Sequence, residues 1–432
     1  MVYAVRRRVV YRMKRGAAAL ALLLGMACTS STTVVRTVEP EEPTREPTEA
    51  RPTEGKPAEP SPGSPALISA GELSIPDASV ALGSDRAGLL KALDRSLGWF
   101  ERPSSRDRFP MYGISHSRAW ASVYAFRQLV RDYESPGEFK RRVEAEFDFY
   151  TSIGSDGRGT VLYTGYYSPT FEGSRVRTAS FPHPLYRLPE DLVKDPATGE
   201  TLGQRVGESI TPYPERAEIE RSGMLAGTEL VWLRSQWDAY LVHVQGSAAL
   251  SLTDGTTLHI GYAGNNGHPY VSPARELVAD GKISEAELSL DEVKAYFESH
   301  PDDVDTYLRR NPRFIFFREE KSSNWPLGSL GVPVTPLRTI ATDKELFPPG
   351  GVTLVMTRAT DASGRSRPFQ QFMLDQDRGG AILSPGRVDI YFGIGAQAER
   401  RAGDEYFEGR LYYLFLKPQR LGVWEQRAGL DF

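Results

Sequence analysis

From about residue 160 onward, the chain consists of short apolar runs that are interrupted every few residues by Gly, Pro or Asp. Runs of this length, rich in β-branched and aromatic residues and bounded by turn residues, are typical of β-strands. The whole sequence contains 40 glycines and 31 prolines, which favours a loop-rich β protein over a helical bundle. The runs that predict strands are VLYTGYYSP, LVHVQGSAALSLTDGTTLHIGYAG, RFIFF, GVTLVMTRAT, QQFMLDQDRGGAI, RVDIYFGIG and RLYYLFLKP.

Helical patterns precede these strands and interrupt them once. Apolar residues recur at helical spacing over 85–100, 117–133 and 136–151, and we expect three amphipathic helices there. A further helical stretch is predicted at about 273–309. The sequence therefore predicts a mostly β protein with N-terminal helices.

The N-terminus has the pattern of a bacterial lipoprotein signal. A basic segment is followed by the apolar run Gly16 to Ala27, which is too short to span a bilayer, and then by Cys28, the only cysteine. We expect cleavage after residue 27 and lipidation of Cys28. Thr29 is typical of an outer-membrane address, which places the expected body at the periplasmic face of the outer membrane. The alternative is an ordinary secretory signal with a chance cysteine nearby.

Residues 28–67 are rich in Pro, Glu, Thr and Ser and contain no aromatic residue. Such a segment cannot bury enough apolar surface to offset its ordering entropy, so it is expected to be a disordered tether. After cleavage the chain would carry 46 basic and 56 acidic residues, a net charge of −10. A negative charge of this size does not favour binding to nucleic acid or to anionic lipid. The acyl anchor would therefore be needed to hold the protein at its membrane.

Several classes of active site are excluded by the sequence. One cysteine rules out intramolecular disulfides and Cys-based metal centres. The six histidines have no metal-ligand spacing, and the sequence contains no HExxH, Walker or GxSxG motif. We therefore expect no metal and no cofactor, and the remaining candidates are carboxylates in strands.

Two places supply such carboxylates. Asp375 and Asp377 are two residues apart in one strand and should share a face. Asp389 lies between Val388 and Ile390, in the middle of a strand, where Asp is rare. If Asp389 is buried, its pKa is raised, as a general acid near neutrality requires. The alternative is an Asp at a loop edge that caps a turn.

Other side chains suit a sugar ligand, which needs aromatic faces and planar polar groups. The candidates for substrate binding are Tyr166, Tyr167, Gln245, Asn266 and Tyr391, the last on the same face as Asp389. Taken singly, each has a plainer interpretation, because tyrosine pairs in strands usually pack and NNGH is usually a turn.

Nine signatures occur in order between residues 163 and 415: TGYYSP, PLYRLP, YPERAEIE, VQGS, YAGNNGHPY, NPRFIFF, PPG, DRGGAI and VDIYFGIG. Together they resemble the membrane-bound lytic murein transglycosylase A family. The resemblance implies a double-psi β-barrel with an inserted second, smaller β-domain and a glycan strand in the groove between them. The expected parts are a signal peptide at 1–27, the tether at 28–67, an N-terminal helical part at 68–165, the inserted domain at 166–318 and the catalytic barrel at 319–432.

The same resemblance implies non-hydrolytic cleavage of peptidoglycan, between N-acetylmuramic acid and N-acetylglucosamine, to give a 1,6-anhydromuramyl end. It assigns the catalytic carboxyl to Asp389 and a supporting one to Asp377, whereas Asp375 has no counterpart. Two positions depart from the family pattern, Asn265 in place of Lys and Ala248 in place of Gly. We expect a monomer. The alternatives are a hydrolase that uses Asp377 or Asp375 as its base, and a wall-binding lipoprotein without activity.

Overall fold

A computed structural model describes residues 65–71, 76–196, 199–285, 288–361 and 363–429. The expected signal peptide, Cys28 and nearly all of the expected tether lie outside these residues. Within them, no helix is both long enough and apolar enough to cross a bilayer.

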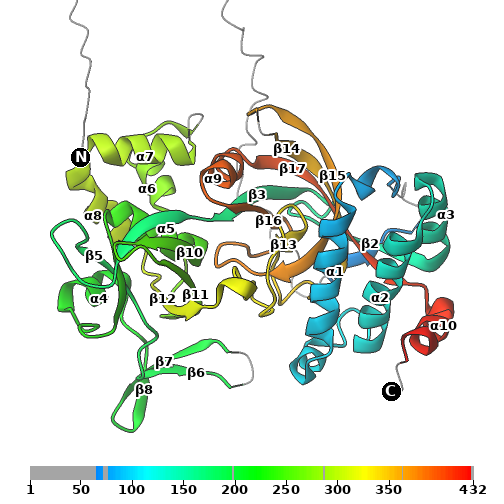
Figure 1. Cartoon of the computed structure of the whole chain (residues 1–432), viewed down its shortest axis with the longest axis horizontal. Coiled ribbons are helices and arrows are strands. Elements are labelled where there is room, and N and C mark those ends of the chain that lie inside the picture. The colour runs from blue at the N-terminus through cyan, green and yellow to red at the C-terminus, as the bar shows by residue number, and fades with distance from the viewer. Residues whose placement is uncertain (1–64, 72–75, 197–198, 286–287, 362, 430–432) are drawn as a thin grey trace, which may run out of the picture. The chain divides into compact units, whose positions relative to one another are not determined.

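Six strands form a closed barrel (Figure 1). Strand β3 closes it, because it pairs in parallel with β16 on one side and antiparallel with β17 on the other. Two further strands, β1 and β2, continue the sheet from β17. The strands of this sheet are β1 (Leu67–Ser69), β2 (Phe147–Ser152), β3 (Val161–Ser168), β13 (Thr339–Ala341), β14 (Val352–Thr360), β15 (Ser366–Asp377), β16 (Arg387–Ile394) and β17 (Tyr406–Leu416).

Helices α1 (Arg86–Phe100), α2 (His116–Asp132) and α3 (Pro136–Glu146) share one hydrophobic core with the barrel. The first two confirm the predictions for 85–100 and 117–133. The third prediction extends too far, because residues 147–152 form β2. The FDFYTS segment alternates, burying Phe147 and Phe149, and β2 pairs along its length with β17. Two short C-terminal helices, α9 (Ala396–Gly403) and α10 (Pro418–Ala428), were not predicted.

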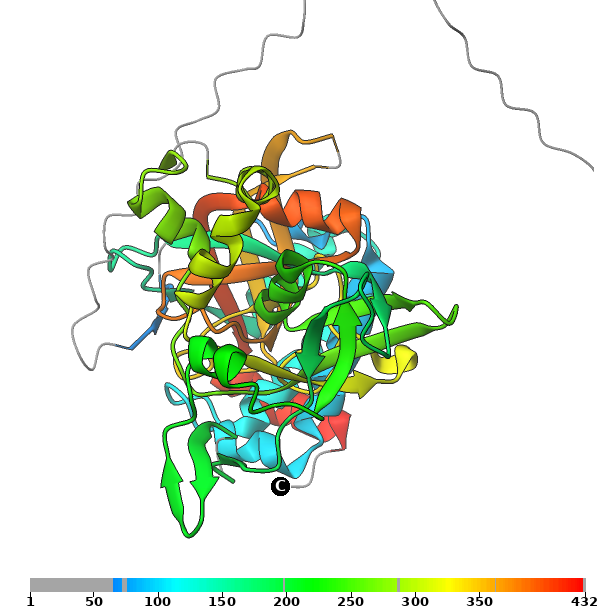
Figure 2. The same ribbon diagram turned by 90° about the vertical axis from the view of Figure 1, so that its left-hand side faces the viewer.

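A second, six-stranded sheet is built from the chain between β3 and β13, in the order β12-β11-β10-β4-β9-β5, with its own hydrophobic core. A three-stranded sheet, β6-β7-β8, extends away from it in both views (Figures 1 and 2). The strands are β4 (Thr170–Ser174), β5 (His183–Tyr186), β6 (Leu192–Lys194), β7 (Thr201–Val206), β8 (Ser209–Thr211), β9 (Glu229–Leu233), β10 (Ser247–Leu252), β11 (Thr257–Asn265) and β12 (Ile315–Glu320).

Five helices accompany these sheets: α4 (Arg216–Ser222), α5 (Gln236–Gln245), α6 (Pro273–Ala279), α7 (Leu290–Ser299) and α8 (Pro301–Arg309). The last three confirm the helical stretch predicted at about 273–309. The LVHVQ segment, predicted as a strand, is instead the end of α5. The side chain of Ser235 caps the start of this helix, and Gly246 ends it in the left-handed conformation. These local helix signals outweigh the β-propensity of the two valines.

The change from one sheet to the other falls slightly later than the expected boundaries at 166 and 318. Strand β3 remains in the barrel to Ser168, and β12 remains in the second sheet to Glu320. At the other end, Ala66 and Leu67 are already buried, so the core begins within the last residues of the expected tether.

Gly165 in β3 allows helix α9 to lie against the barrel. A Cβ atom on Gly165 would be 2.7 Å from Cα and 2.9 Å from the carbonyl oxygen of Ala402, which is in α9. It would also be 2.8 Å from the ring of Phe392. Because two of these neighbours are backbone atoms, they cannot move aside as a flexible side chain would. The glycine of the TGYY segment is therefore a packing requirement.

We predict that Gly165→Ala lowers the free energy of unfolding by about 1–3 kcal/mol, because the added methyl group pushes α9 away from β3. Gly98→Ala is the matched control, since a Cβ there has no neighbour within 4 Å. Gly98 is in α1, where alanine should stabilise by up to about 1 kcal/mol. Urea unfolding of both variants measures the difference, and equal midpoints for the two would contradict the packing argument.

Candidate active site

Asp389 lies in strand β16, which pairs with β13 on one side and with β3 on the other. Its neighbours Val388 and Ile390 are fully buried in the barrel core, while Asp389 is partly exposed. It is opposite Thr164 of β3 and Ala341 of β13 in the sheet register. The Thr164 hydroxyl donates a hydrogen bond to Oδ1 of Asp389. Burial raises the pKa of Asp389, against the smaller opposing effects of Thr164 and of the Arg387 charge.

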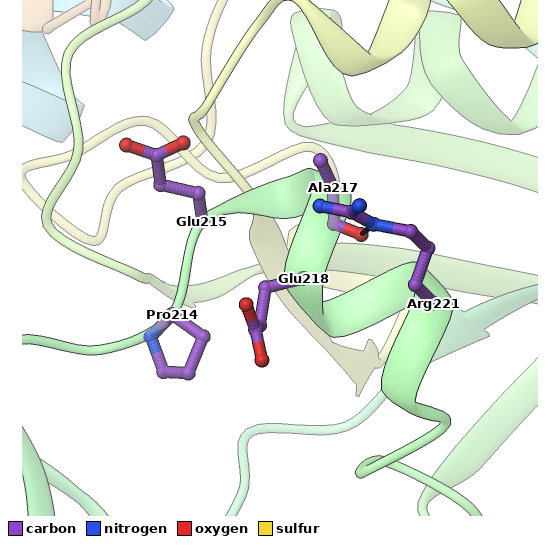
Figure 3. Close-up of a pocket in the computed structure, with 5 residues that line it drawn as sticks. All are labelled: Pro214, Glu215, Ala217, Glu218 and Arg221. Atoms are coloured by element: carbon purple, nitrogen blue, oxygen red, sulfur yellow. Dashed lines mark hydrogen bonds between the residues drawn. The ribbon is translucent and has the colours of Figure 1, made fainter.

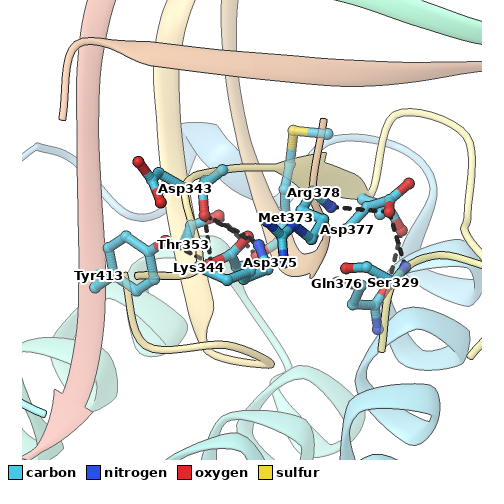
Figure 4. Close-up of polar contacts among 12 residues, drawn as sticks. Ser329, Asp343, Lys344, Thr353, Met373, Asp375, Gln376, Asp377, Arg378 and Tyr413 are labelled. Atoms are coloured by element: carbon cyan, nitrogen blue, oxygen red, sulfur yellow. Dashed lines mark hydrogen bonds and ion pairs between the residues drawn. The ribbon is translucent and has the colours of Figure 1, made fainter. Parts of the chain in front are cut away.

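Asp377, at the end of strand β15, is held by more donors. Its Oδ2 accepts from the Tyr166 hydroxyl at 2.8 Å, and its Oδ1 accepts from the backbone N–H groups of Ser329 and Arg378, each at 2.8 Å (Figure 4). Burial raises the pKa of Asp377, while these three hydrogen bonds oppose the rise by stabilising the charged form. Asp377 is therefore fixed in place and better supported as an anion than Asp389.

The loop that follows Asp377 passes close to the carboxyl group of Asp389. A Cβ atom on Gly379 would lie 3.8 Å from Oδ2 of Asp389, so the DRGG segment runs past that carboxyl group. In addition, the ring of Tyr166, which binds Asp377, lies 5.1 Å from the ring of Tyr391. The structure thus brings Asp389, Asp377, Tyr166 and Tyr391 to one place on the barrel.

Asp375 belongs to a separate group of contacts, shown apart from Asp377 in Figure 4. It is fully buried, forms an ion pair with Lys344, and accepts from the hydroxyls of Thr342 and Tyr413, at 2.8 Å for Tyr413. The expectation that Asp375 and Asp377 face one site is wrong. A register shift pairs Ile340 with Asp375 and Ala341 with Asp377, which interrupts the alternation of side chains.

The remaining sequence candidates are placed as follows. Tyr391 is 1% exposed, and its hydroxyl lies 3.1 Å from that of Ser168. Tyr167 is also 1% exposed, which leaves no ring face for a sugar. Its backbone N–H donates at 3.1 Å to the side-chain oxygen of Gln245, the last residue of α5. Gln245 therefore ties the second part of the molecule to β3.

Asn266 is a structural residue. It is 2% exposed, and its amide nitrogen donates to the carbonyl oxygens of Pro214 and Pro312, each at 2.9 Å. Its amide oxygen accepts from the backbone N–H of Phe314 at 2.8 Å. Both polar atoms of this side chain therefore bind backbone groups. Asn266 holds the segment before β12 in place, in contrast to the expectation that it contacts substrate.

A cavity of about 270 Å³ opens beside the site. It is lined by Thr164 and Gly165 of β3 and by residues of helices α5, α6 and α7, which include Trp237 and Tyr240. Thr164, which lines this cavity, is also the hydrogen-bond donor to Asp389. Its aromatic walls suit a sugar ring, which stacks its apolar face on such side chains. Neither Thr164 nor Trp237 was singled out from the sequence, although Thr164 belongs to the TGYY motif.

A second hollow, of about 260 Å³, lies beside α4 (Figure 3). It is lined by Pro214, Glu215, Ala217, Glu218 and Arg221. Both glutamates are exposed, and none of the sequence candidates lies there. We therefore place the candidate site at Asp389. Among the residues that the structure describes, no group of three or more His, Cys, Asp or Glu side chains is arranged to hold a metal ion.

Comparison with known proteins identifies the family of the chain. The chain matches the family model "MltA specific insert domain" over residues 162–318 and the "3D domain" model over 338–415. It is 30% identical over 287 residues to the membrane-bound lytic murein transglycosylase A of Escherichia coli strain K12, covering 65% of this chain and 73% of that protein. It is also 30% identical over 270 residues to the protein of the same name from Vibrio cholerae, covering 61% and 68%.

Solved structures are similar as well. The membrane-bound lytic murein transglycosylase from Agrobacterium tumefaciens has a TM-score of 0.67 and 25% identity, with 84% of this chain and 99% of that chain covered. For the E. coli MltA structure with bound chitohexaose, the TM-score is 0.65 at 23% identity, with 87% and 98% covered. The second likeness concerns the fold alone.

Proposed function

Because the chain belongs to the membrane-bound lytic murein transglycosylase A family, we propose that it cleaves the β-1,4 bond between N-acetylmuramic acid and N-acetylglucosamine in peptidoglycan without water. The product would carry a 1,6-anhydromuramyl end. Asp389 is proposed as the single catalytic residue, acting first as acid and then as base.

The observation that carries this assignment is the unequal support of two neighbouring carboxyl groups. Asp377 accepts three hydrogen bonds that favour its anion, whereas within the described residues Asp389 accepts one, from Thr164. Two carboxyl groups whose surroundings favour different protonation states are suited to different roles. Asp389 is thus the better proton donor, and Asp377 the better fixed negative charge.

The reaction follows from these roles. Protonated Asp389 gives its proton to the leaving O4 atom of N-acetylglucosamine as the bond from C1 breaks, and Asp377 stabilises the positive charge that develops on the muramyl ring. The Asp389 carboxylate then takes the proton of the muramyl C6 hydroxyl while O6 bonds to C1. No water is consumed, and the intramolecular attack has a high effective concentration.

The same contacts argue against hydrolysis. A hydrolase needs a second carboxylate that is free to activate water or to attack C1. Asp375 is occupied by its ion pair with Lys344, and Asp377 is already bound by three donors. A hydrolase would therefore lack a free base, because both candidate carboxylates, Asp375 and Asp377, are held by other contacts.

We propose further that the glycan strand occupies the cavity beside Thr164 and passes Tyr166, which is partly exposed, whereas Tyr391 is buried beneath it. Membership of the lytic murein transglycosylase A family supports an oligosaccharide ligand. The finer fold assignment is also a proposal, namely a double-psi barrel with an inserted domain at 166–318. We infer a monomer.

Asp389→Asn is expected to lower the rate of anhydromuropeptide release by at least about 10⁴-fold, because Asn keeps the shape of Asp but cannot donate or accept the proton. Glycan affinity should stay near that of the wild type, since the lost interaction belongs to the transition state. Asp377→Asn should lower the rate less. Mass spectrometry of products from purified wall measures the rates, with circular dichroism as the folding control.

A folded Asp389→Asn protein that still releases anhydromuropeptides at a substantial rate would refute the assignment. A reducing end in place of the anhydro end would establish the hydrolase. A wild-type protein that binds glycan but releases no product would establish the wall-binding alternative.

Thr164→Val should move the alkaline limb of the pH profile of kcat/KM to higher pH. The Thr164 hydrogen bond lowers the pKa of Asp389 by stabilising its anion. Removing it raises that pKa further, so the acid stays protonated to higher pH. Thr357→Val is the matched control, because that hydroxyl donates to the Glu408 carbonyl instead. A shift to lower pH, or an equal shift in the control, would contradict the role of Thr164.

Lipidation of Cys28 and a location at the periplasmic face of the outer membrane also remain proposals, supported by the signal pattern and by the membrane-bound relatives. Cys28→Ser should release the protein from the membrane fraction, because the acyl chains would be lost. Cell fractionation and immunoblotting measure this. Unchanged fractionation would exclude the anchor.

A further inference from the structure

Arg313 reaches from the second part of the molecule to the barrel. Its backbone is fixed just before β12, because its N–H donates to the Asn311 side chain at 3.2 Å and its carbonyl accepts from Arg216 at 2.9 Å. The guanidinium donates at 2.9 Å to the carbonyl oxygen of His268. Its Nε atom lies only 3.0 Å from the position of a Cβ atom on Gly380. The side chain therefore lies directly on the loop that follows Asp377.

This guanidinium has no acidic partner. In the described part of the chain, no carboxylate lies within ion-pair distance of Arg313 or of Arg378, although nearby arginines such as Arg309 and Arg310 have such partners. Burial lowers the pKa of Arg313, Tyr262 opposes this effect, and the positive charge of Arg378 adds to it, so Arg378 is near enough to influence Arg313. Partly buried cations without a counter-ion are costly, which indicates that an anion binds there.

The position relative to the proposed acid is also defined. Gly379 and Gly380 are consecutive, and the nearest groups to their Cβ positions include Asp389 at 3.8 Å and Arg313 at 3.0 Å, respectively. Because adjacent residues are about 3.8 Å apart at Cα and each Cβ is about 1.5 Å from its Cα, Nε of Arg313 is at most about 14 Å from the Asp389 carboxyl. This upper limit is comparable with the length of a short oligosaccharide. An anionic substituent on a sugar next to the cleaved bond would be within reach.

We propose that Arg313, together with Arg378, binds a carboxylate carried on the C3 lactyl arm of a muramyl residue, and so selects muramyl glycans over neutral ones. The inference rests on the proposed function. In peptide-bearing glycan the arm continues as a peptide with carboxylates of its own, and in glycan stripped by an amidase it ends in a free carboxylate. A guanidinium group can bind either kind of carboxylate through a bidentate pair of hydrogen bonds.

The test measures binding and so does not depend on catalysis. Titration calorimetry compares three soluble ligands: peptide-bearing muramyl oligosaccharide, the same oligosaccharide after amidase treatment, and neutral chitohexaose. All proteins carry Asp389→Asn so that the ligands stay intact. The variants are Arg313→Gln, Arg313→Lys and Arg378→Gln, with Arg318→Gln as the control, because Arg318 is on β12 and pairs with Glu320.

Arg313→Gln should weaken the binding of muramyl ligands about tenfold to a hundredfold and leave chitohexaose within about twofold. Arg313→Lys should recover part of the loss, and Arg318→Gln should behave as the parent. Arg378 is exposed, so Arg378→Gln should fold normally and show a smaller loss of the same kind. A loss confined to the stripped ligand assigns the lactyl carboxylate, and one confined to the peptide-bearing ligand assigns the stem peptide.

An equal loss for chitohexaose, or no loss for either muramyl ligand, would overturn the inference. So would an Arg318→Gln effect as large as that of Arg313→Gln. Failure of the proposed function is distinguishable, because it is measured from the products that the wild-type protein releases from purified wall, whereas this test measures binding alone.

Discussion

Strand β3 is the element on which the rest of the structure depends. It is hydrogen-bonded to β16 on one side and to β17 on the other, so it closes the barrel. In the same few residues it places Thr164 opposite Asp389, leaves room for α9 at Gly165, and directs Tyr166 to Asp377. After Ser168 the chain leaves for the second sheet. The closing strand of the fold therefore also supplies the proposed acid's hydrogen-bond partner and one wall of the cavity.

The two carboxyl groups at the site illustrate how the same side chain acquires different roles. Both are desolvated, which disfavours their charged forms. Asp377 ends a strand, where turn N–H groups are free to donate, and it accepts two of them. Asp389 is in mid-strand, where backbone N–H groups bind neighbouring strands, so its hydrogen bond comes from the Thr164 side chain. Position along a strand thus sets which group is more readily protonated.

The sequence predicted the elements with strong periodicity. It also drew attention to Asp389 as a candidate acid, because an Asp between two aliphatic residues is unusual in a strand. The separation of Asp375 from Asp377 could not be predicted, because it depends on a register shift in the pairing of β13 with β15, which strict alternation does not include. Likewise, LVHVQ has β-propensity, but Ser235 and Gly246 make it helical. Arg313 could be recognised only once the fold placed it on Gly380.

The proposed site is formed by residues from two sheets that have separate hydrophobic cores. The proposed acid belongs to the barrel, whereas the unpaired guanidinium belongs to the segment before β12. The distance between these two groups depends on contacts away from the reacting bond. Examples are the hydrogen bonds from the Tyr167 backbone N–H to Gln245 and from the Phe314 backbone N–H to Asn266. Binding energy from a charged arm on the sugar can thus hold the bond against Asp389, and orientation of this kind lowers a barrier that the acid alone would leave high.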